Sequence, residues 1–357
     1  MRVVISGYFG YHNVGDEAIL KSIITALRSQ NPNIDIVVLS NDVEYTKKTY
    51  NVDAINRWSI IDIYNTLRKS DGLISGGGSL LQDATSNRPI KYYTGIMALA
   101  KLARKPVFIY AQGMGPINNN TNRKITKYFL QKSDYITLRD EESKELLKSI
   151  GVTKNIDIVP DPVMGYEINN FESDICKDFS DNYISISVRD WDKSKNNFLE
   201  KVAKSCDKLI ENGYEIVFVP MHGEHDDKTS RKVIDMMKNE ARVFSYNSSI
   251  EEKILCIKKS KLMIGMRLHA LIFAATVNTP MIGISYDPKI DSFLKLVNQS
   301  CVGSVDDNNW DGERLSQLAL NILNNYNESK KELIANSNTL KYSAQKTAEK
   351  AISVFSK

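Results

Sequence analysis

Short runs rich in valine and isoleucine alternate with amphipathic segments along most of this 357-residue chain. Such alternation is typical of βα units wound on a parallel sheet, because each strand needs a crossover segment to return to the same edge. In the first half, the runs predicted as strands are residues 3–6, 34–39, 52–55, 72–75, 106–111, 135–138 and 156–159. The clearest helix is predicted at 16–29, where apolar residues recur on one helix face.

A polar, irregular stretch divides this pattern into two series. We predict an N-terminal Rossmann-like domain over residues 1–165, a linker over 166–182 and a second Rossmann-like domain over 183–357. The strands of the second domain are predicted at 183–188, 215–219, 242–245, 262–265 and 281–285, and two helices follow from about residue 314. The predicted fold is therefore α/β, with two Rossmann-like domains facing a central cleft. The terminal helices are free to pack on either domain.

Charge and cysteine content narrow the classes of function. The formal net charge is +4 and unlike charges are interleaved, so dedicated nucleic-acid binding is not indicated, whereas contact with an anionic lipid or sugar phosphate remains open. The four cysteines lie far apart, which suits a reducing compartment and indicates neither a disulfide framework nor a zinc site. No apolar stretch has the length of a membrane span, so we expect a cytoplasmic location.

The junction at residues 262–279 is the strongest candidate for a functional site. A strand-like run there meets a helix-like run with almost no loop, which places Arg267 and His269 at the amino end of the helix. Unpaired backbone N–H groups and the helix dipole attract phosphate or carboxylate at such an end. We therefore expect an anionic substrate here and a proton handled by His269, although a histidine in a first turn is often only a packing residue.

Two further arginines, Arg139 and Arg189, also end predicted strands. A guanidinium offers forked donors that carboxylates and phosphates accept in pairs. Arg139 is followed by acidic residues, so a surface ion pair is the alternative interpretation for it. With Arg267, the set predicts a binding site for a small dianion or trianion.

Glycine-rich loops that follow predicted strands of the first domain are candidates for binding a second substrate. In the loop at 7–17, Asn13 and Asp16 are candidate ligands of sugar hydroxyls, with Asp16 as a base or, alternatively, only a helix N-cap. The glycine spacing is not G-x-G-x-x-G, so a dinucleotide site is not expected.

A second such loop carries three successive glycines, which leave room for a ligand beside the sheet. These are Gly76, Gly77 and Gly78, followed by Gln82 and Asp83 as candidate hydroxyl ligands. The glycine-rich loop that begins at Gln112, after the strand predicted at 106–111, would line the same ligand site.

The spacing His222-x-x-His225, flanked by acids, requires a metal to be considered. No further ligand cluster is evident in the sequence, so we predict no metal. In this interpretation Asp226 or Asp227 caps the next helix and His222 faces the cleft.

Six segments, taken in order, resemble the polysaccharide pyruvyl transferase family, most closely its CsaB-like bacterial cell-surface-anchoring members. They read GYFGYHNVGDEAIL, SGGGSLLQD, YAQGMGP, TLRDEES, VPDP and MRLHALIFA. The resemblance implies a GT-B-like fold and transfer of pyruvate from phosphoenolpyruvate to a sugar, with a ketal formed across two hydroxyls and phosphate released. It implies no cofactor, since phosphoenolpyruvate is a co-substrate.

In CsaB-like members the implied acceptor is N-acetylmannosamine in a lipid-linked precursor of the secondary cell-wall polymer, which anchors S-layer proteins once pyruvylated. Such an acceptor would bring the protein to the inner face of the cytoplasmic membrane. Arg267, Leu268 and His269 match the donor-binding motif, with an additional arginine that we expect to be Arg139 or, alternatively, Arg189.

The expected chemistry assigns proton delivery or assistance to phosphate departure to His269, and removal of the hydroxyl proton to Asp16 or Asp83. Two other interpretations stay open. One is a GT-B glycosyltransferase that uses a nucleotide sugar, and the other is a non-catalytic glycan or nucleotide binder.

Overall fold

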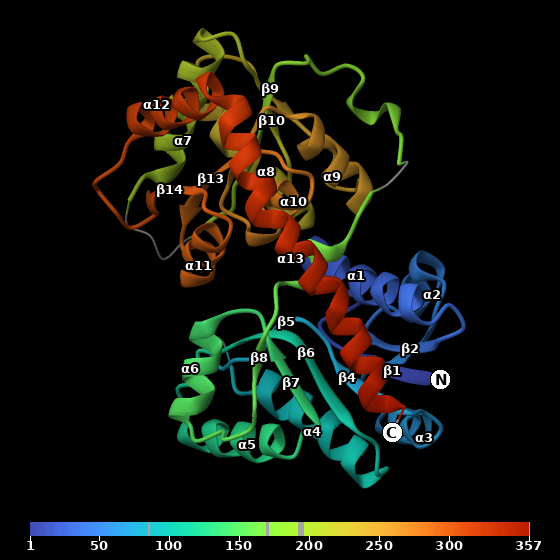
Figure 1. Cartoon of the computed structure of the whole chain (residues 1–357). Helices are drawn as coiled ribbons and strands as arrows, with labels where there is room; N and C mark the ends of the chain where they lie inside the picture. Colours follow the sequence, from blue (N-terminus) through green and yellow to red (C-terminus); the bar gives the residue numbers. More distant parts are fainter. Residues whose placement is uncertain (85, 169–170, 192–195, 357) are drawn as a thin grey trace. The chain divides into compact units, whose positions relative to one another are not determined.

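The computed structural model describes residues 1–84, 86–168, 171–191 and 196–356. The chain forms two compact units, one made of Met1–Tyr166 with Leu340–Lys357 and the other of Glu167–Thr339. Most helices and strands of both units are labelled in Figure 1. Each unit is built on its own parallel sheet, which sets which strand ends lie together within it.

The sheet of the first unit has eight strands among the described residues, in the order β3-β2-β1-β4-β6-β7-β8, with β5 paired to β6. All of its pairings are parallel. The strands are β1 (Arg2–Ser6), β2 (Asp35–Ser40), β3 (Asp53–Asn56), β4 (Gly72–Ser75), β5 (Gly78–Leu81), β6 (Val107–Met114), β7 (Tyr135–Leu138) and β8 (Asp157–Ile158). The central strands are buried throughout, as expected for a parallel sheet covered on both faces.

The helices of the first unit are α1 (Val14–Gln30), α2 (Val43–Tyr50), α3 (Ile60–Arg68), α4 (Arg88–Leu102), α5 (Asn120–Gln131) and α6 (Glu141–Ser149), with a short 3₁₀ helix, η1 (Pro162–Gly165). Helix α1 begins earlier than predicted, because the Asn13 side chain accepts the backbone N–H groups of Gly15 and Asp16 at 3.0 and 3.4 Å. Asn13 is therefore the N-cap, and Asp16 lies in the first turn.

The second unit has a six-stranded sheet among its described residues, in the order β11-β10-β9-β12-β13-β14, again with parallel pairings. Its strands are β9 (Tyr183–Ser187), β10 (Glu215–Phe218), β11 (Arg242–Val243), β12 (Leu262–Gly265), β13 (Met281–Ser285) and β14 (Ser300–Ser304). Its helical segments are η2 (Asp174–Cys176), α7 (Phe198–Glu211), α8 (Gly223–Met236), α9 (Ile250–Lys259), α10 (Leu268–Thr276), α11 (Pro288–Leu296) and α12 (Gly312–Asn324).

The last helix, α13 (Tyr326–Phe355), contributes residues to both units. Its final residues pack on the first sheet, where the Phe355 ring occupies the space beside Gly72 and Lys350 pairs with Asp157 at 2.6 Å. The predicted second domain, 183–357, thus differs from the compact unit, because the apolar end of this helix covers strands of the first unit.

The predicted linker, 166–182, is not a simple spacer. Residues 169 and 170 of it lie outside the described residues. Cys176 of η2 is buried, and this segment belongs to the second unit. The described residues contain no helix that is both long and apolar enough to cross a membrane.

Candidate active site

In the second unit, three neighbouring strands bring the predicted anion-binding residues to one edge of the sheet. Strands β10, β9 and β12 lie side by side, with Phe218 and Ile264 both in register with Ile186. The carboxyl ends of parallel strands share one edge. The residues that follow these ends form what we call the second-unit cluster: Arg189, His222, His225, Asp226, Arg267 and His269.

An ion pair between Arg267 and Asp226 fixes this cluster. Arg267 is the N-cap residue of α10, and its Nε donates to Asp226 Oδ2 at 2.9 Å while its Nη2 donates to Oδ1. Asp226 is fully buried and also accepts the backbone N–H groups of Met221 and His222 at 3.2 and 2.9 Å. Asp226 uses two of the five guanidinium N–H groups, and so it orients Arg267 at the amino end of α10 without using all its donors.

His269 is the second residue of α10 and is partly buried. It stands in the first turn, whose backbone N–H groups lie at the positive end of the helix dipole. Leu268 is buried, so it can serve an anion only through its backbone. The rest of α10 is almost wholly buried, which fixes the position of this helix end in the unit.

Arg189 adds to the positive field of the cluster, and His222 responds to that field. Partial burial and then the charge of Arg267 lower the pKa of His222 below its ordinary value, Arg189 acts in the same direction, and Asp226 opposes it. The Arg189 guanidinium lies over the rings of Trp191 and Tyr286, at 5.0 and 4.5 Å from their centroids. A bound anion would relieve the mutual repulsion of these groups.

The structure also gathers His222, His225 and Asp226, whose ligand atoms lie within 4.8 Å of one another. These residue types suit a divalent metal. However, Arg267 places its positive charge against the same carboxylate, and that arrangement opposes a cation. Neither Asp226 nor Asp227 is the N-cap of α8, since that position belongs to His222.

A different set of residues lies at the strand ends of the first unit. Tyr8 and Tyr11 are stacked with ring centroids 4.1 Å apart, and Tyr8 is 42% exposed. Beside them Arg57 is buried, donates to the Gly7 carbonyl at 3.0 Å and lies 5.3 Å from the Tyr11 ring centroid. The negative charge of Asp16 acts on Tyr8, whose pKa is raised mainly by burial. We call Tyr8, Tyr11, Asn13, Asp16 and Arg57 the first-unit cluster.

The triple glycine has a packing explanation in this unit. A side chain at Gly77 would meet Ile19 Cγ2 at 2.8 Å, and one at Gly78 would lie 3.1 Å from Asp16 Oδ1, both atoms belonging to α1. Gly78 also has a φ of +83°. At Gly76 the nearest atoms would be at ordinary contact distance. The glycines therefore let α1 approach the sheet, whereas the sequence predicted room for a ligand.

The three other polar residues predicted at these loops turn toward their own chain. Asp83 accepts the backbone N–H groups of Asn118 and Asn119 at 2.7 and 2.9 Å and the side-chain amide of Asn122 at 2.9 Å. Burial opposes ionisation, but these hydrogen bonds outweigh it and lower the pKa of Asp83.

Gln112 is fully buried and donates to Ser75, and Gln82 accepts the N–H of Ala84 at 2.8 Å. These contacts favour structural roles for Gln82, Asp83 and Gln112.

Arg139 is similarly engaged within the first unit. Its guanidinium donates to Ser79 Oγ at 2.9 Å and lies 3.4 and 3.5 Å from carboxylate oxygens of Asp161 and Asp140. A side chain at Gly113 would meet the guanidinium at 2.8 Å, so the absence of one makes room for it. Two carboxylates thus compensate the charge of Arg139.

Sequence reasoning missed Arg57, the Tyr8–Tyr11 pair and the partnership of Asp226 with Arg267. Arg57 follows the predicted strand at 52–55, so the rule that selected the other strand-end arginines also applies to it. The Asp226 pairing joins residues 41 positions apart and leaves no local signal in the sequence.

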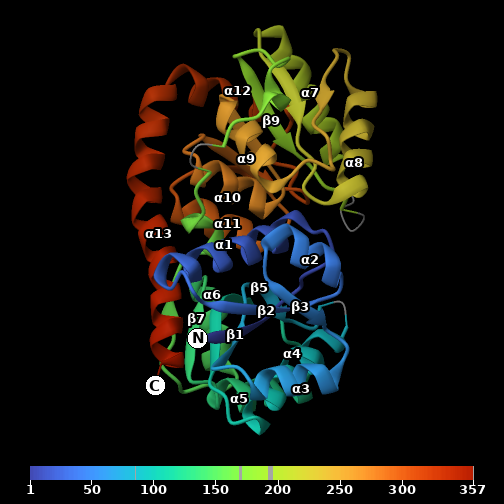
Figure 2. The ribbon, with the colours of Figure 1, turned by 90° about the vertical axis from the view of Figure 1, so that its right-hand side faces the viewer.

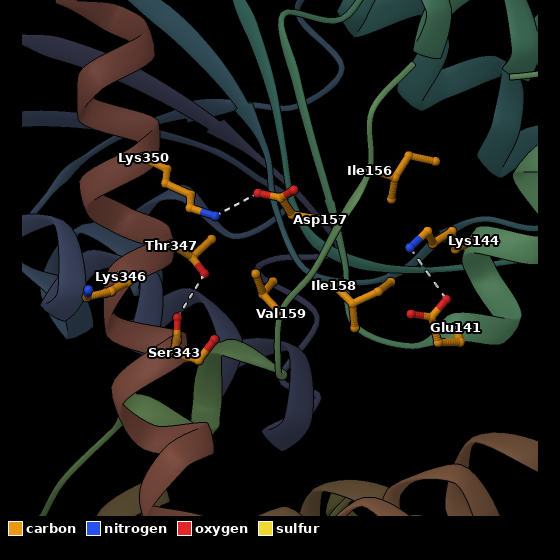
Figure 3. A pocket seen from close by; sticks show the side chains of 10 residues that line it. All are labelled: Glu141, Lys144, Ile156, Asp157, Ile158, Val159, Ser343, Lys346, Thr347 and Lys350. Atoms are coloured by element: carbon orange, nitrogen blue, oxygen red, sulfur yellow. Dashed lines mark hydrogen bonds and ion pairs between the residues drawn. The ribbon is translucent and has the colours of Figure 1, made fainter. Parts of the chain in front are cut away.

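A hollow of about 560 Å³ in the first unit lies elsewhere, between β8, α6 and the end of α13. Figure 3 shows its lining, where Lys350 meets Asp157 and Lys144 meets Glu141. None of the predicted site residues lines it, and two of its lysines are paired with carboxylates. We therefore do not place the chemistry there.

Comparison with solved structures assigns the architecture to the GT-B type. The chain resembles the UDP complex of MnaA from S. aureus (TM-score 0.66, 12% identity, 99% and 95% of the two chains). It also resembles HepE from Anabaena with UDP-glucose (TM-score 0.66, 11% identity, 99% of each chain). A third relative in fold is the lipopolysaccharide heptosyltransferase II of E. coli (TM-score 0.54, 13% identity, 92% and 100%). The predicted α/β fold class of GT-B type is confirmed.

The family follows from the sequence itself. The model for polysaccharide pyruvyl transferase matches residues 13–288, and the chain belongs to that family. A curated relative is the amylovoran biosynthesis protein AmsJ of Erwinia amylovora, 21% identical over 401 residues that cover 93% of this chain and 94% of AmsJ.

Proposed function

We propose that the protein transfers pyruvate from phosphoenolpyruvate to a sugar, forming a pyruvate ketal and releasing phosphate. The observation that carries the proposal is the second-unit cluster, in which Arg189, an oriented Arg267 and the amino end of α10 lie at one sheet edge. A carboxylate and a phosphate on one small molecule suit such a set of donors. Membership of the pyruvyl transferase family supports the same reaction.

The chemistry proceeds by two additions of hydroxyl oxygen to one carbon. Protonation of the methylene carbon of phosphoenolpyruvate makes C2 electrophilic, and a sugar hydroxyl attacks it and loses its proton to a base. A second hydroxyl then displaces phosphate, which carries away the second proton, and the ring closes. We assign the protonation, or assistance to phosphate departure, to His269, and the base to Asp16. Asp83 is the weaker candidate base because three donors from residues 118–122 already hold its carboxylate.

The additional arginine is proposed to be Arg139 or Arg189. The motif around Arg139 favours the first, and the shared sheet edge with Arg267 favours the second. Replacing each by glutamine and measuring the KM for phosphoenolpyruvate distinguishes them. Replacement of the arginine that binds phosphoenolpyruvate should raise that KM at least about tenfold, since a hydrogen bond to a charged group is worth about 1.5–3 kcal/mol.

For the acceptor, we propose N-acetylmannosamine in a lipid-linked precursor of a secondary cell-wall polymer, as in CsaB-like members. The support is the run of matching segments from GYFGYHNVGDEAIL to MRLHALIFA. The first-unit cluster suits a sugar, because the stacked tyrosines offer an apolar face and Asp16 and Asn13 offer polar atoms. The proposed reaction needs no cofactor and no metal.

Incubation with phosphoenolpyruvate and a synthetic N-acetylmannosaminyl acceptor tests the proposal. We expect acid-labile pyruvate on the sugar and an equal amount of phosphate, and His269→Ala should abolish both while the protein stays folded. Turnover only with a nucleotide sugar, such as those named with the solved GT-B relatives, would establish a glycosyltransferase instead. Binding of either substrate without any turnover would indicate a non-catalytic binder.

A further inference from the structure

Three large apolar side chains stand uncovered at the amino end of α3, in the first unit. Trp58, Ile60 and Ile61 are 60, 65 and 75% exposed. The buried residues of the same helix are Ile63 and Leu67, so these two side chains form the face of α3 that packs on the core. Trp58, Ile60 and Ile61 therefore form a separate outward face, which we call the α3 patch.

Two contacts hold Trp58 in place. The Trp58 ring lies 5.1 Å from the Tyr92 ring of α4, and the backbone N–H of Trp58 donates to Asn56 Oδ1 at 2.8 Å. Figure 2 shows α3 and α4 near one another in the first unit. Ordered apolar side chains that stay in water cost free energy, so an uncovered group of this kind marks a contact surface.

Two exposed cationic side chains of α4 lie close to the patch. Arg88 and Lys91 are exposed on the first turns of α4, and Arg88 lies one helical turn before Tyr92, on the same face. Arg68 and Lys69 stand at the opposite end of α3, about 12 Å along the helix. The first turn of α3 also carries one exposed carboxylate, Asp62, which accepts the Ser59 hydroxyl at 2.5 Å. A tryptophan and two isoleucines flanked by Arg and Lys match what an anionic bilayer surface binds.

The patch also adjoins the first-unit cluster. Trp58 follows Arg57 directly, and the Arg57 guanidinium lies 5.3 Å from both the Trp58 and the Tyr11 ring centroids. If Trp58 inserts into lipid, the loop at residues 7–17, which is proposed to bind the sugar, would lie close to the lipid headgroups. Three side chains at one helix end are also fewer than the 20–30 residues per side of a stable protein–protein interface.

We propose that Trp58, Ile60 and Ile61 insert into the headgroup region of a membrane rich in anionic lipid, with Arg88 and Lys91 contacting the lipid phosphates. This surface would bring the enzyme to an acceptor that is itself anchored in lipid. The membrane contact does not require the proposed function to be correct, since it rests on exposure and charge alone.

Vesicle flotation of the full chain tests the proposal. With vesicles of equal parts phosphatidylglycerol and phosphatidylcholine, the wild type should float, and Trp58→Ser/Ile60→Ser/Ile61→Ser should lower the bound fraction at least about tenfold. Ile61→Asp is a gentler variant that suits a helix amino end and should also lower it. Arg88→Gln/Lys91→Gln should remove the preference over pure phosphatidylcholine vesicles.

The matched control is Leu102→Ser, which removes a side chain 68% exposed at the other end of α4, about 20 Å along the helix. It should float as the wild type does. Failure of the wild type to float, or equal flotation of the triple variant, overturns the proposal. Self-association of the wild type that the triple variant abolishes would show a protein interface and overturn it too.

Activity separates this proposal from the proposed function. The triple variant should keep wild-type turnover with a water-soluble acceptor and lose at least about tenfold with a lipid-linked acceptor in vesicles. If no acceptor is turned over by the wild type while flotation behaves as expected, the proposed function fails and the membrane surface stands.

Discussion

The strand-end arginines of the two units differ in how far neighbouring carboxylates compensate their charge. In the second-unit cluster, Arg189, Arg267 and a helix amino end outweigh the buried carboxylate of Asp226. In the first unit, the carboxylates of Asp140 and Asp161 balance Arg139, and what faces outward is the exposed ring of Tyr8, with Asp16 close by. The difference teaches that strand-end arginines alone do not mark an anion site, because neighbouring carboxylates decide how much charge is left for a ligand.

The largest expected effect comes from breaking the Arg267–Asp226 pair. Arg267→Ala should remove phosphoenolpyruvate binding. It should also lower the free energy of unfolding by about 3–5 kcal/mol, since it leaves the buried carboxylate of Asp226 uncompensated. Urea unfolding measures the second effect and phosphate release the first.

The double variant Arg267→Met/Asp226→Leu separates stability from activity. It should recover most of the lost stability, because the unpaired charge is gone, yet stay inactive. Substantial phosphate release by this double variant would mean that the pair serves only the fold.

The next effect separates the two predicted bases. Asp16→Asn should lower kcat by about 10²–10⁴-fold, the usual contribution of a general base, and leave the KM for phosphoenolpyruvate unchanged. Asp83→Asn should cost about 1 kcal/mol in unfolding free energy and little in kcat, since Asp83 holds residues 118–122. The reverse pattern would exchange the roles of the two carboxylates.

A smaller effect concerns pH. Because the pKa of His222 is lowered in the folded protein, the unfolded chain takes up its proton first, and stability present above the ordinary pKa of histidine is lost as the pH falls below it. Inorganic phosphate should raise this pKa by placing negative charge nearby.

Imidazole proton resonances followed by NMR, with His222→Gln to assign them, measure both shifts. A His222 resonance that titrates at the ordinary histidine pKa and ignores phosphate would contradict the positive field of the second-unit cluster.

The smallest effects test the packing role of the glycines. Gly77→Ala should destabilise by about 1–3 kcal/mol because the new methyl group meets Ile19. Gly95→Ala in α4 is the matched control, since its added atom meets nothing within 4 Å, and should stabilise by about 0.5–1 kcal/mol. Equal thermal midpoints for the two variants would contradict the packing role of Gly77.

The sequence predicts most of this fold because buried parallel strands carry a local signal. The predicted runs at 72–75, 135–138, 262–265 and 281–285 coincide with β4, β7, β12 and β13. Among the described residues, two strands were not predicted. The first, β5, reads GSLL after a glycine run and becomes a strand only by pairing with β6, and β14 is a polar edge strand beside a bulge.

The candidate site likewise has features that the sequence predicts and features that it does not. The position of Arg267 and His269 at a helix start is local, and the structure places both there as the motif predicts. The surroundings of Gln112 and Asp83 depend on loops 30 to 40 residues away, so the sequence could not show that their polar atoms are already used. Tertiary contacts therefore determine which groups surround a residue at the end of a strand.

The central claim is that the second-unit cluster holds phosphoenolpyruvate and the first-unit cluster holds the sugar. Calorimetric titration of phosphoenolpyruvate into the wild type, Asp16→Asn and Arg267→Met/Asp226→Leu tests it most directly. The claim predicts that Asp16→Asn binds as the wild type does and that the double variant loses at least about a hundredfold in affinity. Wild-type affinity in the double variant, or loss of binding in Asp16→Asn alone, would contradict it.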